Sequence, residues 1–141
     1  MALTSLPDNL LSDLSDRQRD AVTHTDGPLL IIAGPGSGKT RVMAHRVAYL
    51  IGVTGVSPWK ILAVTFTNKA ARELLERCER LVGSGSNELQ VRTFHGFCSR
   101  VLRSDGENVG LKPDFTIYDS DDQARVIRRI LEDIDIDPKQ F

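Results

Sequence analysis

A glycine-rich run near the start of the chain constrains the fold more than any other feature. The run reads Ala33-Gly34-Pro35-Gly36-Ser37-Gly38-Lys39-Thr40. It follows the continuous apolar stretch 29–33, which is typical of a strand buried on both faces, and precedes a helical apolar pattern over 39–51. A strand, a glycine-rich loop and a helix in this order form the setting of a phosphate-binding P-loop. The sequence therefore predicts an α/β fold with a phosphate site.

Each part of the loop has a physical role in holding phosphate. The glycines let backbone N–H groups converge on phosphate oxygens, and the helix N-terminus adds unpaired donors and a positive dipole end. Lys39 can reach the β- and γ-phosphates of a nucleoside triphosphate, and the Thr40 hydroxyl can ligate Mg²⁺. Ala33 stands where the general pattern has glycine. The alternative is a glycine-rich turn followed by an ordinary surface lysine.

The pattern downstream of the loop predicts further alternation of strands and helices. Short apolar runs over 61–65 and 89–93 read as strands, and the segments 68–82 and 94–103 read as helices. Such alternation is typical of a mostly parallel sheet with helices on its faces. Ahead of the loop, we expect a short helix over 15–24 with Ser15 as its N-cap.

Charge is divided unevenly along the chain of 141 residues. Residues 1–104 carry 13 Lys and Arg against 9 Asp and Glu, whereas residues 105–141 carry 5 against 10. We therefore expect a loose lead-in over 1–14, a basic working domain over 15–104, and an acidic appendage over 105–141. Two ordinary solvated surfaces would produce the same asymmetry.

Membrane and secreted classes are disfavoured by the sequence. The longest apolar runs, 29–33 and 47–51, are far too short to cross a bilayer, and no basic-then-apolar leader opens the chain. We therefore expect no membrane partner and a cytoplasmic location. Cys78 and Cys98 then read as reduced core thiols in helical segments.

Three further segments, with the loop, resemble the motifs of the UvrD/PcrA/Rep group of superfamily 1 DNA helicases. The segment 14–22 (LSDRQRDAV) resembles the Q motif, 64–71 (VTFTNKAA) resembles motif Ia, and 93–96 (TFHG) resembles motif Ib. Alanine at the position of Ala33 is common in that group. The resemblance implies a RecA-like motor domain that uses ATP and Mg²⁺, with Lys39 and Thr40 in catalytic roles. The ATP-binding residues it implies are Gln18, Ala33, Gly34, Pro35, Gly36, Ser37, Gly38, Lys39, Thr40 and Arg41.

Gln18 has two interpretations. By resemblance its amide recognises adenine, because an amide can donate and accept hydrogen bonds at once. Structurally, Ser15 and Gln18 also match a helix capping box. Arg41 likewise lies either beside the nucleotide or on the solvated face of its helix.

The resemblance also implies contacts with single-stranded DNA by Phe66, Thr67, Asn68, Thr93 and His95. Phe66 follows a predicted strand, and ligands bind beyond the carboxyl ends of strands in open α/β sheets. An aromatic ring there can stack on a nucleobase. His95 reads as the equivalent position after the next strand. The alternatives are a core Phe66 and a structural His95. Arg72 and Arg77 read as the solvated face of their helix.

The family's second ATPase motif, an apolar strand ending in Asp-Glu, is absent from this sequence. Residues 115–119 mimic it, but Ser120 replaces the glutamate and 120–123 matches a capping box. The segment 105–141 better resembles the start of a helical accessory subdomain.

We therefore expect the N-terminal part of a longer helicase that translocates 3′ to 5′ on single-stranded DNA and unwinds duplexes, with the rest of that helicase as its partner. Alone, this part should bind ATP weakly and not hydrolyse it. The alternatives are another P-loop ATPase or small kinase, and a non-catalytic truncated module that binds ATP or DNA.

Overall fold

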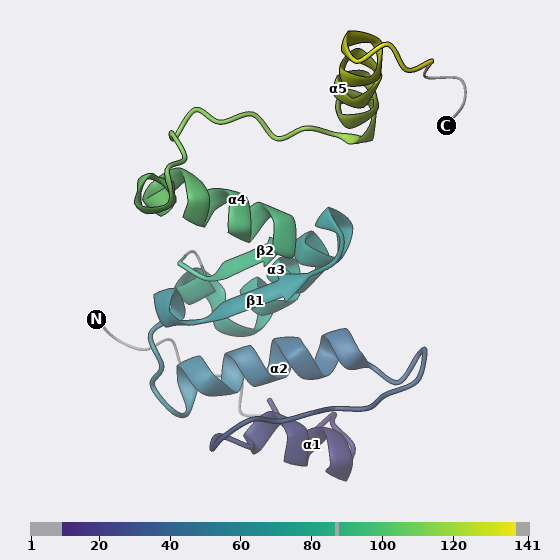
Figure 1. Cartoon of the computed structure of the whole chain (residues 1–141). Coiled ribbons are helices and arrows are strands. Elements are labelled where there is room, and N and C mark those ends of the chain that lie inside the picture. Colours follow the sequence, from purple (N-terminus) through teal and green to yellow (C-terminus); the bar gives the residue numbers. More distant parts are fainter. Residues whose placement is uncertain (1–9, 87, 138–141) are drawn as a thin grey trace. The chain divides into compact units, whose positions relative to one another are not determined.

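A computed structural model describes residues 10–86 and 88–137 (Figure 1). The described part divides into two compact units between Cys98 and Ser99. The helices are α1 (Asp16–Thr23), α2 (Lys39–Gly52), α3 (Asn68–Val82), α4 (Phe94–Asp105) and α5 (Ser120–Asp133). The strands are β1 (Leu62–Thr65) and β2 (Gln90–Thr93), and short 3₁₀ turns cover Pro58–Lys60, Gly83–Ser86 and Gly106–Val109.

The two strands form a parallel sheet joined by a helical crossover, as the sequence predicts. Leu62 pairs with Gln90 and Thr65 with Thr93 at the two ends of the register. Between the strands runs α3, which packs against both of them and has the predicted bounds. The described residues therefore form an α/β fold with an open two-stranded sheet, consistent with an incomplete RecA-like domain.

The predicted strand over 29–33 is wrong. In the structure this segment has no regular secondary structure, and the exposed fractions of Leu30 and Ile32 are 83% and 90%. A strand needs a hydrogen-bonding neighbour, and among the described residues the sheet consists of β1 and β2 alone. Even β1 is not buried on both faces, since Leu62 is 45% exposed. The apolar side chains of Leu30 and Ile32 are therefore exposed to solvent, although their composition favours burial.

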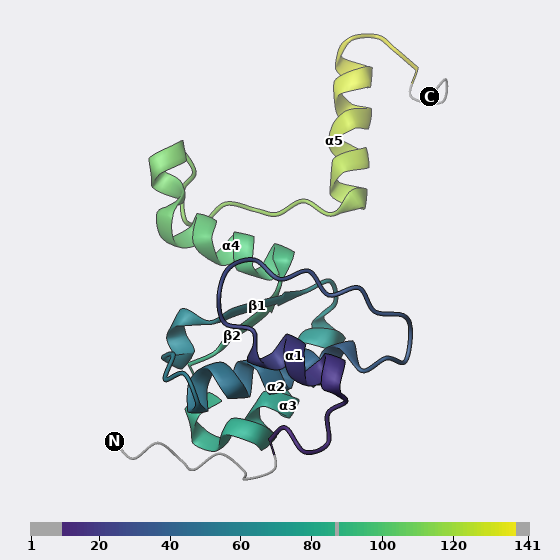
Figure 2. The same cartoon turned by 90° about the horizontal axis from the view of Figure 1, so that it is seen from below.

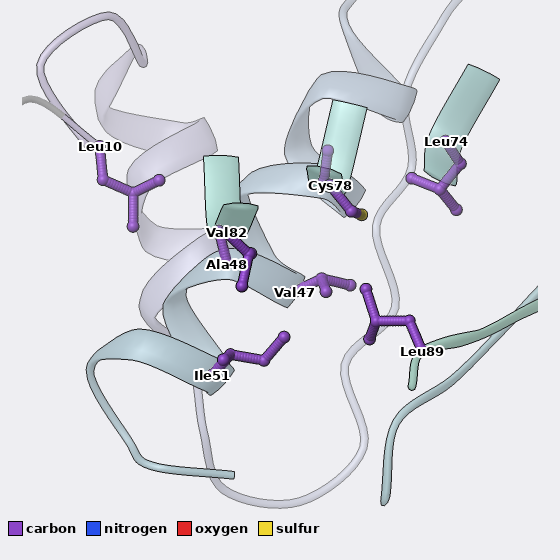
Figure 3. Packing of buried hydrophobic residues seen from close by; sticks show 9 residues of the cluster. Leu10, Val47, Ala48, Ile51, Leu74, Cys78, Val82 and Leu89 are labelled. Atoms are coloured by element: carbon purple, nitrogen blue, oxygen red, sulfur yellow. The ribbon is translucent and has the colours of Figure 1, made fainter. Parts of the chain in front are cut away.

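The main core lies between α2 and α3 and is closed by residues from outside these helices (Figure 3). Apolar side chains at helical spacing on α2 meet a matching stripe on α3, which explains why both helices appear where periodicity predicts them. Leu10 and Leu14, which the sequence assigns to a loose lead-in, are buried. The buried cluster comprises Leu10, Ala44, Val47, Ala48, Ile51, Leu74, Cys78, Val82 and Leu89.

Helix α1 is held beside α2 by polar contacts as well as by packing (Figure 2). Arg46 on α2 donates from Nη1 to the backbone oxygen of Ala21 at 2.8 Å and also to that of His24. These carbonyls belong to the last turn of α1 and the residue after it, where helical acceptors lack intrahelical partners. The contacts fix α1 next to the helix that begins at the glycine-rich loop.

The second unit contains the end of α4, an extended connection and α5. The Asp119 carboxylate caps α5, accepting from the Asp122 backbone N–H at 2.8 Å, while the Asp122 side chain returns the contact at 3.4 Å. The capping box predicted over 120–123 is therefore displaced by one residue, because a charged carboxylate precedes Ser120 and is a good N-cap acceptor. The apolar stripe of α5, which includes Ile127 and Ile130, is exposed.

The two cysteines differ in their environment. Cys78 is buried in the main core, as predicted, but the prediction of a core position for Cys98 is wrong because this side chain is exposed. Both are free thiols. Burial raises the pKa of the Cys78 thiol from its ordinary value of 9.0 to about 11, and the neighbouring Glu79 carboxylate adds to the rise.

This contrast predicts selective alkylation. At pH 8, iodoacetamide should modify Cys98 rapidly and leave Cys78 unmodified, because only the thiolate reacts and a raised pKa lowers its fraction about 100-fold. Mass spectrometry of timed samples measures the two rates, and the same reaction in urea provides the control in which both cysteines react. Equal rates in the native chain would contradict the packing of α2 on α3.

Candidate nucleotide site and nucleic-acid surface

The glycine-rich loop has the backbone geometry that its sequence demands. Gly36 and Gly38 adopt φ values of 75° and 85°, a left-handed region that favours glycine. Gly38 is the N-cap of α2, so the loop leads directly into the helix N-terminus with its unpaired N–H groups. The Ser37 hydroxyl donates to the Gly34 carbonyl at 2.7 Å and closes the turn.

Lys39 lies folded back over the loop. Its Nζ donates to the carbonyl oxygens of Gly34 at 2.7 Å and of Ala33 at 3.3 Å. Both acceptors are neutral, whereas a phosphate is an anion and forms stronger, charge-assisted hydrogen bonds with an ammonium. The ammonium is therefore already held at the loop where a phosphate would replace its carbonyl partners.

Gln18 joins α1 to the loop. Its Oε1 accepts from the Ser15 backbone N–H at 3.0 Å, and its backbone N–H donates to the Ser15 hydroxyl at 3.4 Å, so the capping box is confirmed. In addition, its Nε2 donates to the Ser37 carbonyl at 3.0 Å. A Cβ added at Gly38 would lie 3.0 Å from that Nε2, so a side chain there would displace the Gln18 amide, while the positive φ is what favours glycine at this position. Recognition of adenine by Gln18 stays a prediction.

Two open pockets flank the loop and share Lys39. The pocket on the α1 side has a volume of about 320 Å³ and includes Gln18, Ala21 and Ile31 in its walls. The pocket on the other side has a volume of about 280 Å³. It is lined by Gly36, Gly38, Lys39, Thr40, Arg41 and, from α3, Arg77. Sequence reasoning missed Arg77, because no local pattern indicates that α3 packs beside the loop.

The candidate DNA residues gather at the carboxyl ends of β1 and β2. The register pairs Thr65 with Thr93, so Phe66 and Phe94 are the first residues beyond the strands. Their ring centroids lie 5.6 Å apart, and their exposed fractions are 89% and 47%. The core interpretation of Phe66 is therefore wrong. Phe94, rather than His95, therefore follows β2 as Phe66 follows β1. Aligning the last residues of the two predicted strands, Thr65 and Thr93, would have shown this equivalence from the sequence.

The polar candidates of this surface lie at the starts of α3 and α4. The Thr67 hydroxyl accepts from the Ala70 backbone N–H at 3.1 Å, and the Thr93 hydroxyl accepts from that of Gly96 at 3.1 Å. Both threonines therefore act as local caps. Asn68 and His95 are exposed in the first turns of these helices, where N–H groups and the positive dipole end favour an anion.

The residues for a magnesium site are only partly present. Thr40 follows Lys39 at the start of α2 and supplies a hydroxyl of the expected kind. Within residues 10–86 and 88–137, no group of three His, Cys, Asp or Glu side chains could hold a metal ion. Asp119, whose strand-like context mimics an ATPase motif, serves as the N-cap of α5.

No helix in the described ranges has the length and apolar character needed to cross a membrane.

Comparison with known proteins agrees with the motif order. The family model described as the UvrD/REP helicase N-terminal domain matches residues 14–141. Relatives include the ATP-dependent DNA helicase PcrA of Bacillus subtilis (strain 168), 51% identical over 96% of this chain, and that of Staphylococcus aureus (strain Mu50), 50% identical over 94%. The chain spans only 18% of the length of each of these relatives. With its motifs, loop geometry and α/β fold, the chain belongs to the UvrD/REP helicase N-terminal domain family.

Proposed function

We propose that this chain is the ATP-binding N-terminal part of a DNA helicase that moves 3′ to 5′ along single-stranded DNA and unwinds duplexes. The observation that carries the proposal is the glycine-rich loop, in which the Lys39 ammonium and the N-terminus of α2 come together at glycines with positive φ. The similar PcrA proteins are named ATP-dependent DNA helicases, which supports the same activity for the parent protein.

In this proposal, each of the two pockets binds a different part of the nucleotide. The phosphates occupy the loop and contact Lys39, while the base lies toward α1, where Gln18 forms part of the wall. Gln18 would exchange its contact with the Ser37 carbonyl for the adenine edge, because its amide has both a donor and an acceptor. Magnesium would bind Thr40 together with phosphate oxygens. When bound, the ion neutralises charge that develops on the phosphates.

Single-stranded DNA is the proposed ligand of the surface beyond β1 and β2. Phe66 offers an exposed ring to a base, and Phe94 supports that ring from the first residue of α4. Phosphates would meet the first turns of α3 and α4 near Asn68 and His95. This exposed aromatic pair favours a helicase over a small P-loop kinase, which has no need of such a surface.

The rest of the helicase is the proposed partner that covers the exposed segment 29–33. Leu30 and Ile32 have the composition of a buried strand but are solvated here. Family resemblance implies a further strand in the same sheet, one that carries the second ATPase motif. That strand would supply both hydrogen-bond partners for the segment and the carboxylates needed for hydrolysis.

The test separates binding from turnover in the 141-residue chain. Calorimetry with Mg-ATP should detect weak, saturable binding, and phosphate release should stay at background with or without single-stranded DNA. The reason is that the described residues supply Lys39 and Thr40 but no acidic metal cluster. A full-length PcrA helicase is the positive control for the release assay.

Two results would contradict this proposal. Absence of Mg-ATP binding would remove the nucleotide assignment, and the chain would then be a non-catalytic module of another kind. DNA-stimulated phosphate release by the chain itself would show that one of its own acids assists catalysis.

A further inference from the structure

A groove between α2 and α3 continues the pocket on the α3 side of the glycine-rich loop. The groove has a volume of about 350 Å³ and is lined by Arg41, Ala44, His45, Arg77, Arg80 and Leu81. It shares Arg41 and Arg77 with the pocket that contains Lys39 and Thr40. No carboxylate is among the residues that line either space. The two spaces together therefore form a continuous cationic surface that ends at the loop.

The core between α2 and α3 determines which side chain of α3 reaches this surface. Leu74, Cys78 and Val82 are buried against α2 (Figure 3). Arg77 lies three residues after Leu74 and one before Cys78, so it flanks the packed stripe rather than pointing away from α2. Since α3 cannot rotate without breaking the core, the position of Arg77 beside the loop is a consequence of packing.

Arg77 differs from its cationic neighbours in having no partner among the residues that the structure describes. Arg41 lies 3.6 Å from the Asp13 carboxylate, and Arg80 donates from Nε to the Glu76 carbonyl at 3.2 Å. Across the described residues, neither a hydrogen bond nor an ion pair engages Arg77. A guanidinium offers five N–H donors in a planar fork that matches phosphate oxygens. Its donors are therefore available to an anion at the loop.

We propose that Arg77 is a phosphate-binding residue of the nucleotide site, acting from α3 across the loop from Lys39. The proposal rests on the proposed binding of ATP and adds a residue from a second helix. It also gives α3 a double role, because the same helix begins at Thr67 and Asn68 on the proposed DNA surface.

The test compares substitutions at two arginines of the same helix in the 141-residue chain. Arg77→Gln should weaken Mg-ATP binding by about tenfold, the effect expected when a hydrogen bond to a charged group is lost. Arg77→Lys should recover part of that loss, because it keeps the charge without the planar fork. Arg72→Gln is the matched control, since Arg72 is exposed on α3 but is not among the residues lining this pocket. Its affinity should stay within about twofold of the unsubstituted chain.

Thermal unfolding followed by circular dichroism distinguishes a binding role from a structural one. All three variants should melt at the temperature of the unsubstituted chain, because both arginines are exposed. If the unsubstituted chain binds Mg-ATP and Arg77→Gln binds it equally well, the role of Arg77 is refuted while ATP binding stands. Equal weakening by Arg72→Gln, or a lower melting temperature for Arg77→Gln alone, would also refute it. If the unsubstituted chain binds no Mg-ATP, both proposals fail together.

Discussion

Lys39→Ala is expected to reduce the Mg-ATP affinity of this chain by at least about 30-fold, the largest effect of any single substitution considered. The Lys39 ammonium is held at the loop by two neutral carbonyls, at 2.7 Å and 3.3 Å. Backbone N–H groups carry only partial charges, so they cannot replace a full positive charge beside a polyphosphate. Isothermal titration calorimetry with Mg-ATP measures the loss.

Lys60→Ala provides the control for this loss of charge. Lys60 is an exposed lysine that lies over the Trp59 ring, 5.2 Å from its centroid, and is not among the residues that line the loop pockets. Its replacement should leave Mg-ATP affinity unchanged within about twofold. If Lys39→Ala bound Mg-ATP as tightly as this control, the loop would be an ordinary glycine-rich turn.

Phe66→Ala is expected to weaken binding of single-stranded DNA by about tenfold and to leave Mg-ATP binding nearly intact. The Phe66 ring is 89% exposed and meets Phe94 at 5.6 Å, so its removal deletes a stacking surface without opening the core. The glycine-rich loop proposed to bind phosphate precedes a different helix, α2. Fluorescence anisotropy with a labelled oligonucleotide, performed on the full-length parent helicase, measures the DNA affinity.

Trp59→Ala serves as the control for an exposed aromatic elsewhere in the fold. Trp59 belongs to the short turn Pro58–Lys60 ahead of β1, whereas Phe66 follows the other end of that strand. Its replacement should leave DNA affinity unchanged within about twofold. A loss of ATP binding without a loss of DNA binding in Phe66→Ala would make Phe66 a structural residue instead.

Local features of this protein could be predicted from sequence because they depend on neighbouring residues. Helix α3 has the predicted bounds 68–82, since an apolar stripe at helical spacing and the Thr67 cap both lie within that segment. The capping box of Ser15 and Gln18 is likewise complete within one helical turn. The glycine-rich loop belongs to the same class, because the positive φ values of Gly36 and Gly38 are allowed by residue type.

Strand formation was less predictable because it requires a partner. The segment 29–33 is as apolar as the interior of a sheet, and yet it forms no ladder with the strands of the described chain. By contrast, the apolar runs of β1 and β2 pair with each other in parallel, because the α3 crossover brings them side by side. Hydrophobic composition favours burial, but hydrogen bonds between strands decide whether a strand exists.

The sequence by itself determined the glycine-rich loop, the order of helices and the residues that carry the family motifs. Only the tertiary structure decided which of these residues meet. The register of β1 and β2 placed Phe94, rather than His95, beside Phe66. Packing of α3 on α2 placed Arg77 in the pocket of Lys39 and Thr40. Both outcomes depend on contacts between segments distant in the chain, and side-chain periodicity within one segment carries no information about which face of another segment it will meet.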